Sequence, residues 1–274
     1  MTRIFTQRRS ILRAAIVLAL TPWTLSNAQA DGQDMWSGLH RDYFDGRQIA
    51  EGDNVVQLDV PERADDPAVV PIKIRIPSTY SGGIRTITVV IDRNPSPIAA
   101  VFKFGAAVGH SGERSIATRV RMDRESPVRA IVETDDGQLH MAVKTVNAAG
   151  GCASVASKNP DSTSNAIGDV RVRVFSPAPG STWLPEAQVM IKHPNNNGMQ
   201  RDPTSGEYIP IMFIQEITAV SGQEIVFKME SSISISANPN LRFTFQPSLD
   251  QEIDIEAVDT TGARFTGRYP AARP

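Results

Sequence analysis

The sequence predicts an all-β protein with two antiparallel β-sandwich domains in tandem and one short helix near the N-terminus. Two observations support this fold class. Apolar and polar side chains alternate with a period of two along most of the chain, and glycine-containing turns separate the alternating runs. Because successive side chains of a strand point to opposite faces of its sheet, such a strand buries one face and exposes the other.

The alternating runs occur in both halves of the chain, at residues 69–77, 84–91, 170–175, 241–246 and 252–258. Turn sequences lie between these runs at residues 81–83, 135–137 and 221–222, and another follows the last run at residues 260–262. Short strands with turns at this spacing are typical of antiparallel sandwiches.

One segment near the start has helical rather than strand periodicity. Apolar side chains there fall on one helical face, after an N-cap candidate at Asp34. We expect this helix to cover the core of the first domain with Met35, Trp36, Leu39, Tyr43 and Phe44.

A loose internal repeat indicates two similar domains. Residues 71–83 resemble residues 169–181, Asn94-Pro95 before an alternating run resembles Asn238-Pro239, and the turn at 136–137 resembles the turn at 261–262. Residues 153–168 are polar and lack any period, which is typical of a linker. We therefore assign residues 31–156 to the first domain, 157–168 to the linker and 169–274 to the second domain.

Residues 1–30 resemble an export signal. Arg3, Arg8 and Arg9 precede an apolar run at 14–20, and residues 28–30 form a small-residue cleavage site. The segment 7–13 resembles a twin-arginine motif, with an ordinary secretory signal as the alternative. We expect a periplasmic protein that begins near Asp31, without a membrane span because the apolar run is shorter than about 20 residues.

Composition excludes several classes of function. The formal net charge of −2 gives no basis for binding nucleic acid or an anionic membrane. The chain has one cysteine, Cys152, so it cannot close an internal disulfide, and we expect a thiol that is free or bonded to another molecule. No clustered ligands or motifs indicate a metal or other cofactor.

Cys152 lies among small residues, between the run 147–151 and Ala153-Ser154. No neighbour from 147 to 157 other than Val155 has bulk, so we expect an accessible thiol on a flexible arm, with Gly150 and Gly151 as its hinge. A catalytic thiol would require an oriented base, and the histidines at 40, 110, 140 and 193 lie in no nucleophile signature. A covalent carrier requires only reach and a mobile tether, and this use fits best.

Other residues have two interpretations. The Asn-, Gly- and Pro-rich segment 193–208 is either a partner-docking surface or a solvated hairpin, and we expect His193 to be structural. Four arginines either steer an anionic cargo toward the thiol or keep the outer face of a strand hydrated: Arg119, Arg121, Arg124 and Arg129.

Longer segments resemble a known family. In the first half, "VVPIKIRIP", "IDRNPSPIAAVFKF", "ATRVRM" and "DDGQLHMAVKTVNAAGGC" are similar to SoxY, a sulfur-oxidation carrier subunit whose chain ends in a Gly-Gly-Cys-Gly-Gly arm. In the second half, "VRVRVFSP", "IKHPNNNGMQRD", "ISANPNLRF" and "AVDTTGARF" are similar to SoxZ, its partner. The fused order resembles the SoxYZ-like carrier proteins associated with quinoprotein dehydrogenases.

The resemblance implies two immunoglobulin-like sandwiches packed against each other and a non-enzymatic carrier without a cofactor. Cys152 would carry a sulfur-type intermediate between periplasmic redox enzymes, with a quinoprotein dehydrogenase or a c-type cytochrome as partner. This arm departs from the family, since it reads "GGCAS" and continues into a second domain. Two alternatives remain: a non-covalent docking module for the dehydrogenase or its cytochrome, and a thiol-exchange or peroxide-reducing enzyme.

Overall fold

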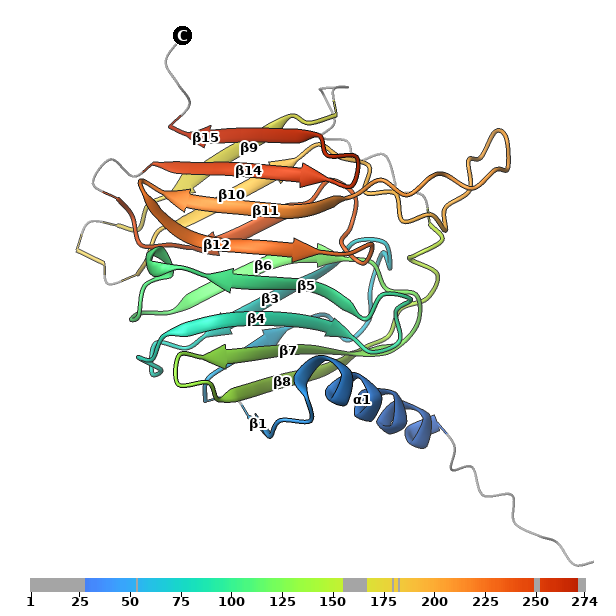
Figure 1. The fold of residues 1–274 in the computed structure, drawn as a ribbon, viewed down its shortest axis with the longest axis horizontal. Coiled ribbons are helices and arrows are strands. Elements are labelled where there is room, and N and C mark those ends of the chain that lie inside the picture. Colours follow the sequence, from blue (N-terminus) through green and yellow to red (C-terminus); the bar gives the residue numbers. More distant parts are fainter. Residues whose placement is uncertain are drawn as a thin grey trace, which may run out of the picture.

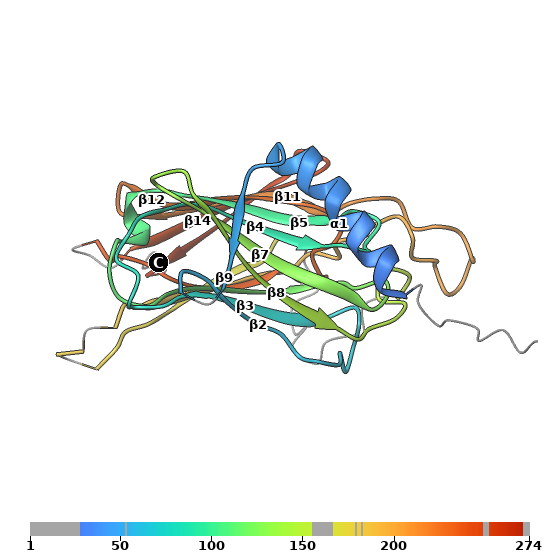
Figure 2. The same cartoon turned by 90° about the horizontal axis from the view of Figure 1, so that it is seen from below.

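The computed structural model describes residues 28–52, 54–154, 167–178, 180–181, 183–248 and 252–270, and these form two β-sheets packed face to face (Figures 1 and 2). The nine-stranded sheet runs in the order β1 (Ile49–Glu51), β8 (Leu139–Val146), β7 (Ser126–Thr134), β4 (Ile84–Ile91), β5 (Ile98–Phe104), β12 (Glu224–Ser231), β11 (Ile214–Ser221), β14 (Ile253–Asp259), β15 (Arg264–Tyr269). The six-stranded sheet runs in the order β2 (Gln57–Asp59), β3 (Val70–Ile76), β6 (Arg114–Val120), β13 (Asn240–Thr244), β10 (Glu186–Ile191), β9 (Val170–Phe175).

The all-β prediction is confirmed, and the alternation has the expected cause. In β3 the residues Val70, Ile72, Ile74 and Ile76 are buried, whereas the residues between them face outward. The strand pairs are antiparallel, except that β1 pairs with β8 in parallel. One sheet face of each strand is therefore available to the shared core.

The two halves of the chain meet edge to edge, so each sheet continues from one sandwich into the other. β5 pairs with β12 in the nine-stranded sheet, from Phe104 opposite Phe227 to Ala100 opposite Ser231. β6 pairs with β13 in the six-stranded sheet. Figure 1 shows strands of the first half (blue to green) directly beside those of the second (yellow to red).

The strand order has an approximate two-fold symmetry about this junction. Outward from it, β5, β4, β7 and β8 correspond to β12, β11, β14 and β15, and β6, β3 and β2 correspond to β13, β10 and β9. The repeat is therefore real, and the turns at Gly137 and Gly262 are equivalent. The other two correspondences predicted from the sequence were wrong. The structure relates β3 to β10 rather than to β9, and β5 to β12 rather than to β13.

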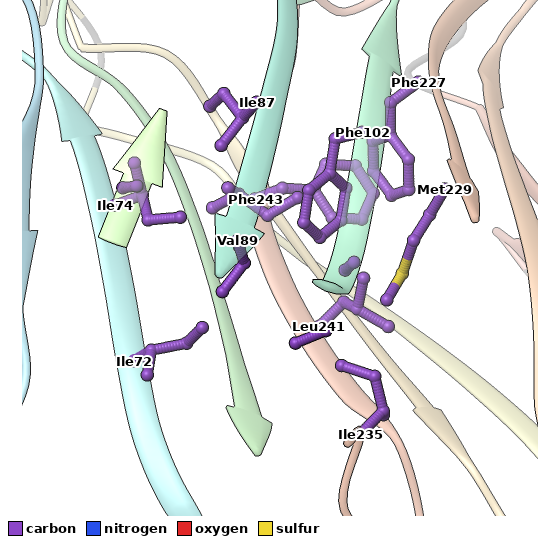
Figure 3. Close-up of a cluster of buried hydrophobic side chains, with 14 of the residues drawn as sticks. Ile72, Ile74, Ile87, Val89, Phe102, Phe227, Met229, Ile235, Leu241 and Phe243 are labelled. Atoms are coloured by element: carbon purple, nitrogen blue, oxygen red, sulfur yellow. The ribbon is translucent and has the colours of Figure 1, made fainter. Parts of the chain in front are cut away.

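One hydrophobic core spans both halves. Figure 3 shows Ile72, Ile74, Ile87, Val89 and Phe102 of the first half interleaved with side chains of the second half. Phe227 is in edge-on contact with Phe102 and Phe243, with ring centroids 5.6 and 4.9 Å apart. The junction is thus packed like a domain interior.

The helix α1 (Ala28–Phe44) lies outside the nine-stranded sheet (Figure 2). It begins before Asp34, so that residue is not its N-cap. Phe44 is buried and Trp36 and Leu39 pack beside it, but Met35 and Tyr43 are 45 % and 55 % exposed, contrary to expectation. Trp36 also covers Arg129, whose guanidinium lies 4.0 Å from the ring centroid. The helix therefore seals a charged as well as an apolar part of the sheet.

Two predicted segments lie largely outside the described residues: the signal peptide, of which 1–27 are not described, and the linker, of which 157–166 are not described. Within the part of the chain that the structure describes, no helix is long and apolar enough to cross a membrane.

Candidate covalent site at Cys152

The segment that carries Cys152 leaves β8 at Val146 and is fixed to the protein by backbone hydrogen bonds. The amide of Gly150 donates to the carbonyl oxygen of Asp123 at 2.7 Å, and the amide of Gly151 donates to that of Met122 at 2.9 Å. The hydroxyl of Ser154 donates back to the carbonyl oxygen of Gly150 at 2.9 Å. We call residues 147–154 the thiol arm, and in this structure the arm is docked.

The thiol of Cys152 is buried, with only 2 % of the residue exposed. The expectation of an accessible thiol is therefore wrong for the docked arm. The small neighbours of Cys152 in sequence do not cover it, but they allow the arm to approach other parts of the chain closely. A Cβ atom on Gly151 would overlap the carbonyl group of Pro67 and lie 2.6 Å from the carbonyl oxygen of Met122.

The second domain supplies part of this docking site through Asn197. Its side-chain amide donates to the carbonyl oxygen of Cys152 at 2.7 Å. Asn197 is itself fixed, because its backbone amide donates to Oε1 of Gln200 and its Oδ1 accepts from the amide of Met199. Sequence reasoning missed Asn197 as a site residue; its only signal was the run of three asparagines at 195–197.

Arg121 lies on the first-domain side of the docked arm and is fully buried. Its Nη1 donates to the carbonyl oxygens of Ser154 at 3.2 Å and Gly151 at 3.5 Å, and its Nη2 to that of Asn195 at 3.5 Å. Its Nε has no hydrogen-bond partner in the described structure. A buried guanidinium that is held only by long bonds to neutral carbonyls is incompletely compensated.

Burial determines the ionisation of the thiol. Removal from water raises the pKa of Cys152 to about 11, with a further rise from the carboxylate of Asp123 and an opposing effect from Arg121. Burial also lowers the pKa of Arg121, against the attraction of Cys152 and Asp66. At neutral pH only about one docked thiol in ten thousand is a thiolate. The docked arm therefore holds Cys152 in an unreactive form.

The four arginines considered from sequence have different surroundings. Arg121 alone among them contacts the thiol arm. Arg129 forms a buried ion pair with Asp92 at 2.8 Å, and Arg124 is exposed beside Asp123. Arg119 donates to the carbonyl oxygen of Asn238 at 3.2 Å. A steering role for the whole set has no support in this arrangement.

The structural role expected for His193 is confirmed. Its ring is buried between Oδ1 of Asn195, 2.7 Å from Nδ1, and the carboxylate of Asp259, 3.4 Å from Nε2. Among the described residues, no histidine is hydrogen-bonded to the sulfur of Cys152, so the thiol lacks the oriented base of a cysteine nucleophile.

Metal sites and surface grooves are two other ways in which a protein can bind a ligand. Within the described ranges, no group of three or more histidine, cysteine or acidic residues is placed to hold a metal ion. A groove of about 520 Å³ crosses the outer face of the six-stranded sheet, between Pro71 and Lys73 of the first half and Gln188 and Arg242 of the second. Its lining does not include the thiol arm.

Comparison with known proteins agrees with this arrangement of two related halves. A family model described as sulfur oxidation protein SoxY matches residues 40–152, and one described as sulphur oxidation protein SoxZ matches residues 178–270. The SoxY match ends at Cys152 itself. The two matches place the protein in the class of sulfur-oxidation carrier proteins, which are carriers and adaptors rather than enzymes. Residues 40–152 are thus a SoxY domain and residues 178–270 a SoxZ domain, joined in tandem in a single polypeptide.

Among solved structures, the sulfur carrier protein SoxY from Chlorobium limicola f thiosulfatophilum matches with 24 % identity and a TM-score of 0.35, over 44 % of this chain and 96 % of that chain. A search of curated proteins returned no match.

Proposed function

We propose that this protein is a periplasmic carrier that binds a sulfur-type intermediate covalently at Cys152 and presents it to redox enzymes. The observation that carries the proposal is the position of the cysteine. Cys152 is the one cysteine of the chain, and it ends the SoxY-matching segment on a Gly-Gly arm at the junction with the SoxZ-matching half.

The burial of the thiol gives this carrier two states. In the docked state the sulfur is inaccessible and its pKa is about 11, which protects a free thiol from unintended reaction. In a released state the arm would be in water, and the thiol would return toward its ordinary pKa and become reactive. Loading therefore requires release of the arm from Arg121 and Asn197.

The arm is held at both ends, since the chain continues into the second domain. Release is therefore a local displacement of residues 147–154 rather than the sweep of a free terminus. A partner enzyme must then approach the protein surface closely. A quinoprotein dehydrogenase or its c-type cytochrome is the partner class that the fused domain order favours.

Burial of the sulfur also favours one competitor, a docking module in which the thiol is incidental. Intact-mass measurement on protein purified from its native host separates the two functions. We expect a mass increment that is lost on reduction and absent from Cys152→Ser. An unmodified thiol in the native protein would support the docking module instead.

A further inference from the structure

The connection between β10 and β11 forms an ordered hairpin, residues 196–212, that projects beyond the sandwich (Figure 1, orange). Asn196 and Met212 exchange backbone hydrogen bonds at 2.8 and 3.0 Å. Further out, the amide of Ile209 donates to the carbonyl oxygen of Gln200 at 2.9 Å, and Arg201 pairs with Tyr208. We call this segment the β10–β11 hairpin.

The hairpin carries two large apolar side chains that the rest of the molecule leaves exposed. Tyr208 is 58 % exposed and Ile211 is 57 % exposed. Arg201 holds the tyrosine in place, because its guanidinium lies 4.1 Å from the ring centroid and its Nη2 donates to the phenolic oxygen at 2.9 Å. Preorganised aromatic and aliphatic side chains lose little conformational entropy on binding, and they are typical anchors of protein interfaces.

The base of the hairpin is connected directly to the thiol arm. Oε1 of Gln200 accepts from the amide of Asn197 at 2.8 Å, and the side chain of Asn197 donates to the carbonyl oxygen of Cys152 at 2.7 Å. Arg121 also bridges the thiol arm and Asn195, the residue that directly precedes the hairpin, since it donates to the carbonyl oxygens of Gly151 and Asn195. An enzyme that reacts with Cys152 must therefore work beside this hairpin.

We propose that the β10–β11 hairpin is the surface on which the enzyme that loads Cys152 docks, with Tyr208 and Ile211 inserted into an apolar pocket of that enzyme. This inference rests on the proposed function, and it adds the surface and the chemistry of the partner's site. Ordered, exposed apolar anchors occur on the hairpin whose base contacts the docked arm, and the hydrogen bonds through Asn197 link docking to release of the arm.

The test compares Cys152 loading in the wild-type protein, in the double variant Tyr208→Ala with Ile211→Ala, and in Trp183→Ala, all expressed in the native host. Trp183 is a matched control, because it is 80 % exposed and lies in the connection at the opposite end of β10. Intact mass gives the loaded fraction, and labelling with iodoacetamide gives the intrinsic accessibility of the thiol. Thermal melting of each protein verifies the fold, and single Tyr208→Ala replaces the double variant if the latter unfolds.

We expect at least a tenfold lower loaded fraction in the hairpin variant, with the control loaded like wild type and iodoacetamide labelling rates within twofold of each other. Equal loading of the hairpin variant and wild type would overturn the inference while leaving the carrier function intact. Equal loading together with a change from dimer to monomer in light scattering would assign the surface to a second copy instead. Absence of any adduct on wild type would overturn the carrier function and this inference with it.

Discussion

At the scale of single residues, Cys152 experiences two opposing influences. Desolvation and the carboxylate of Asp123 disfavour the thiolate, whereas the cation of Arg121 favours it, and desolvation is the larger effect. Arg121 acts on the sulfur through its charge, whereas its hydrogen bonds go to the carbonyl oxygens of Ser154, Gly151 and Asn195. Arg121 thus both holds the arm and partly offsets the rise in the pKa of the thiol.

A pH dependence follows from the raised pKa of the thiol. Between the ordinary value of 9.0 and about 11, the docked protein retains a proton that the unfolded chain has lost. The stability that Cys152 contributes is therefore present below pH 9 and is lost as the pH rises toward 11. Two pKa units correspond to about 2.7 kcal/mol, an upper limit because the arm can undock locally.

This loss of stability is measured by urea unfolding of wild type and Cys152→Ala at about pH 8, 9, 10 and 10.5. These values are taken from the range ~8–11 set by the two pKa values. Titration of lysine and tyrosine affects both proteins, so their difference isolates the thiol. We expect the advantage of wild type to shrink with rising pH. A difference that stays constant across the range would contradict a buried thiol.

At the scale of elements, the thiol arm is held by backbone hydrogen bonds and close backbone contacts rather than by large side chains. Both glycine amides are hydrogen-bonded, so proline at 150 or 151, which has no N–H, would break a bond that holds the arm. Gly150 has φ of +78°, which favours glycine, and Gly151 lies against the carbonyl groups of Pro67 and Met122. The glycines therefore allow the arm to dock, which is a different requirement from swinging.

Gly151→Ala tests this requirement. The added methyl group cannot fit against Pro67 and Met122, so we expect the arm to undock and the iodoacetamide labelling rate of Cys152 to rise at least tenfold. The sandwich should remain folded, because the arm contributes no strand. The measured quantities are the labelling rate and the melting temperature.

Gly38→Ala is the matched control, since its added methyl meets nothing within 4 Å. It should leave labelling unchanged. A Gly151→Ala protein that remains as protected as wild type would show that other contacts hold the arm.

At the scale of the whole molecule, the two halves form one structural unit. Both sheets continue across the junction, and Phe102, Phe227 and Phe243 share one core. Separation would expose this apolar surface and leave the edges of β5, β6, β12 and β13 unpaired. Association of the halves is therefore built into the sheets and does not depend on the linker.

Cleavage of the linker tests that independence. A protease site introduced within 157–168 should yield two fragments that elute together on gel filtration under native conditions. Phe227→Ala should weaken their association, because truncation of a buried phenylalanine costs about 3–5 kcal/mol. The uncut and the cut protein should elute at the same volume. Two separately migrating fragments would contradict a continuous core.

The sequence by itself determined the fold class, the duplication and the position of the cysteine. These properties depend on patterns within short segments, such as the alternation in β3 and the turns at Gly137 and Gly262, and a period of two is sufficient to specify a half-buried strand. Similar strand patterns did not determine which strands are equivalent, so β3 was aligned with β9 instead of β10. Pairing partners depend on contacts that a local pattern does not contain.

Only the tertiary structure decided the state of the thiol. The glycines and alanines around Cys152 indicated exposure, because none of them has a side chain large enough to cover the sulfur. Cover and hydrogen bonds come instead from Pro67, Arg121 and Asn197, which are distant in sequence and on both domains. Burial is a property of the surfaces that fold against a residue, so small neighbours are equally compatible with a free arm and with a closely docked one.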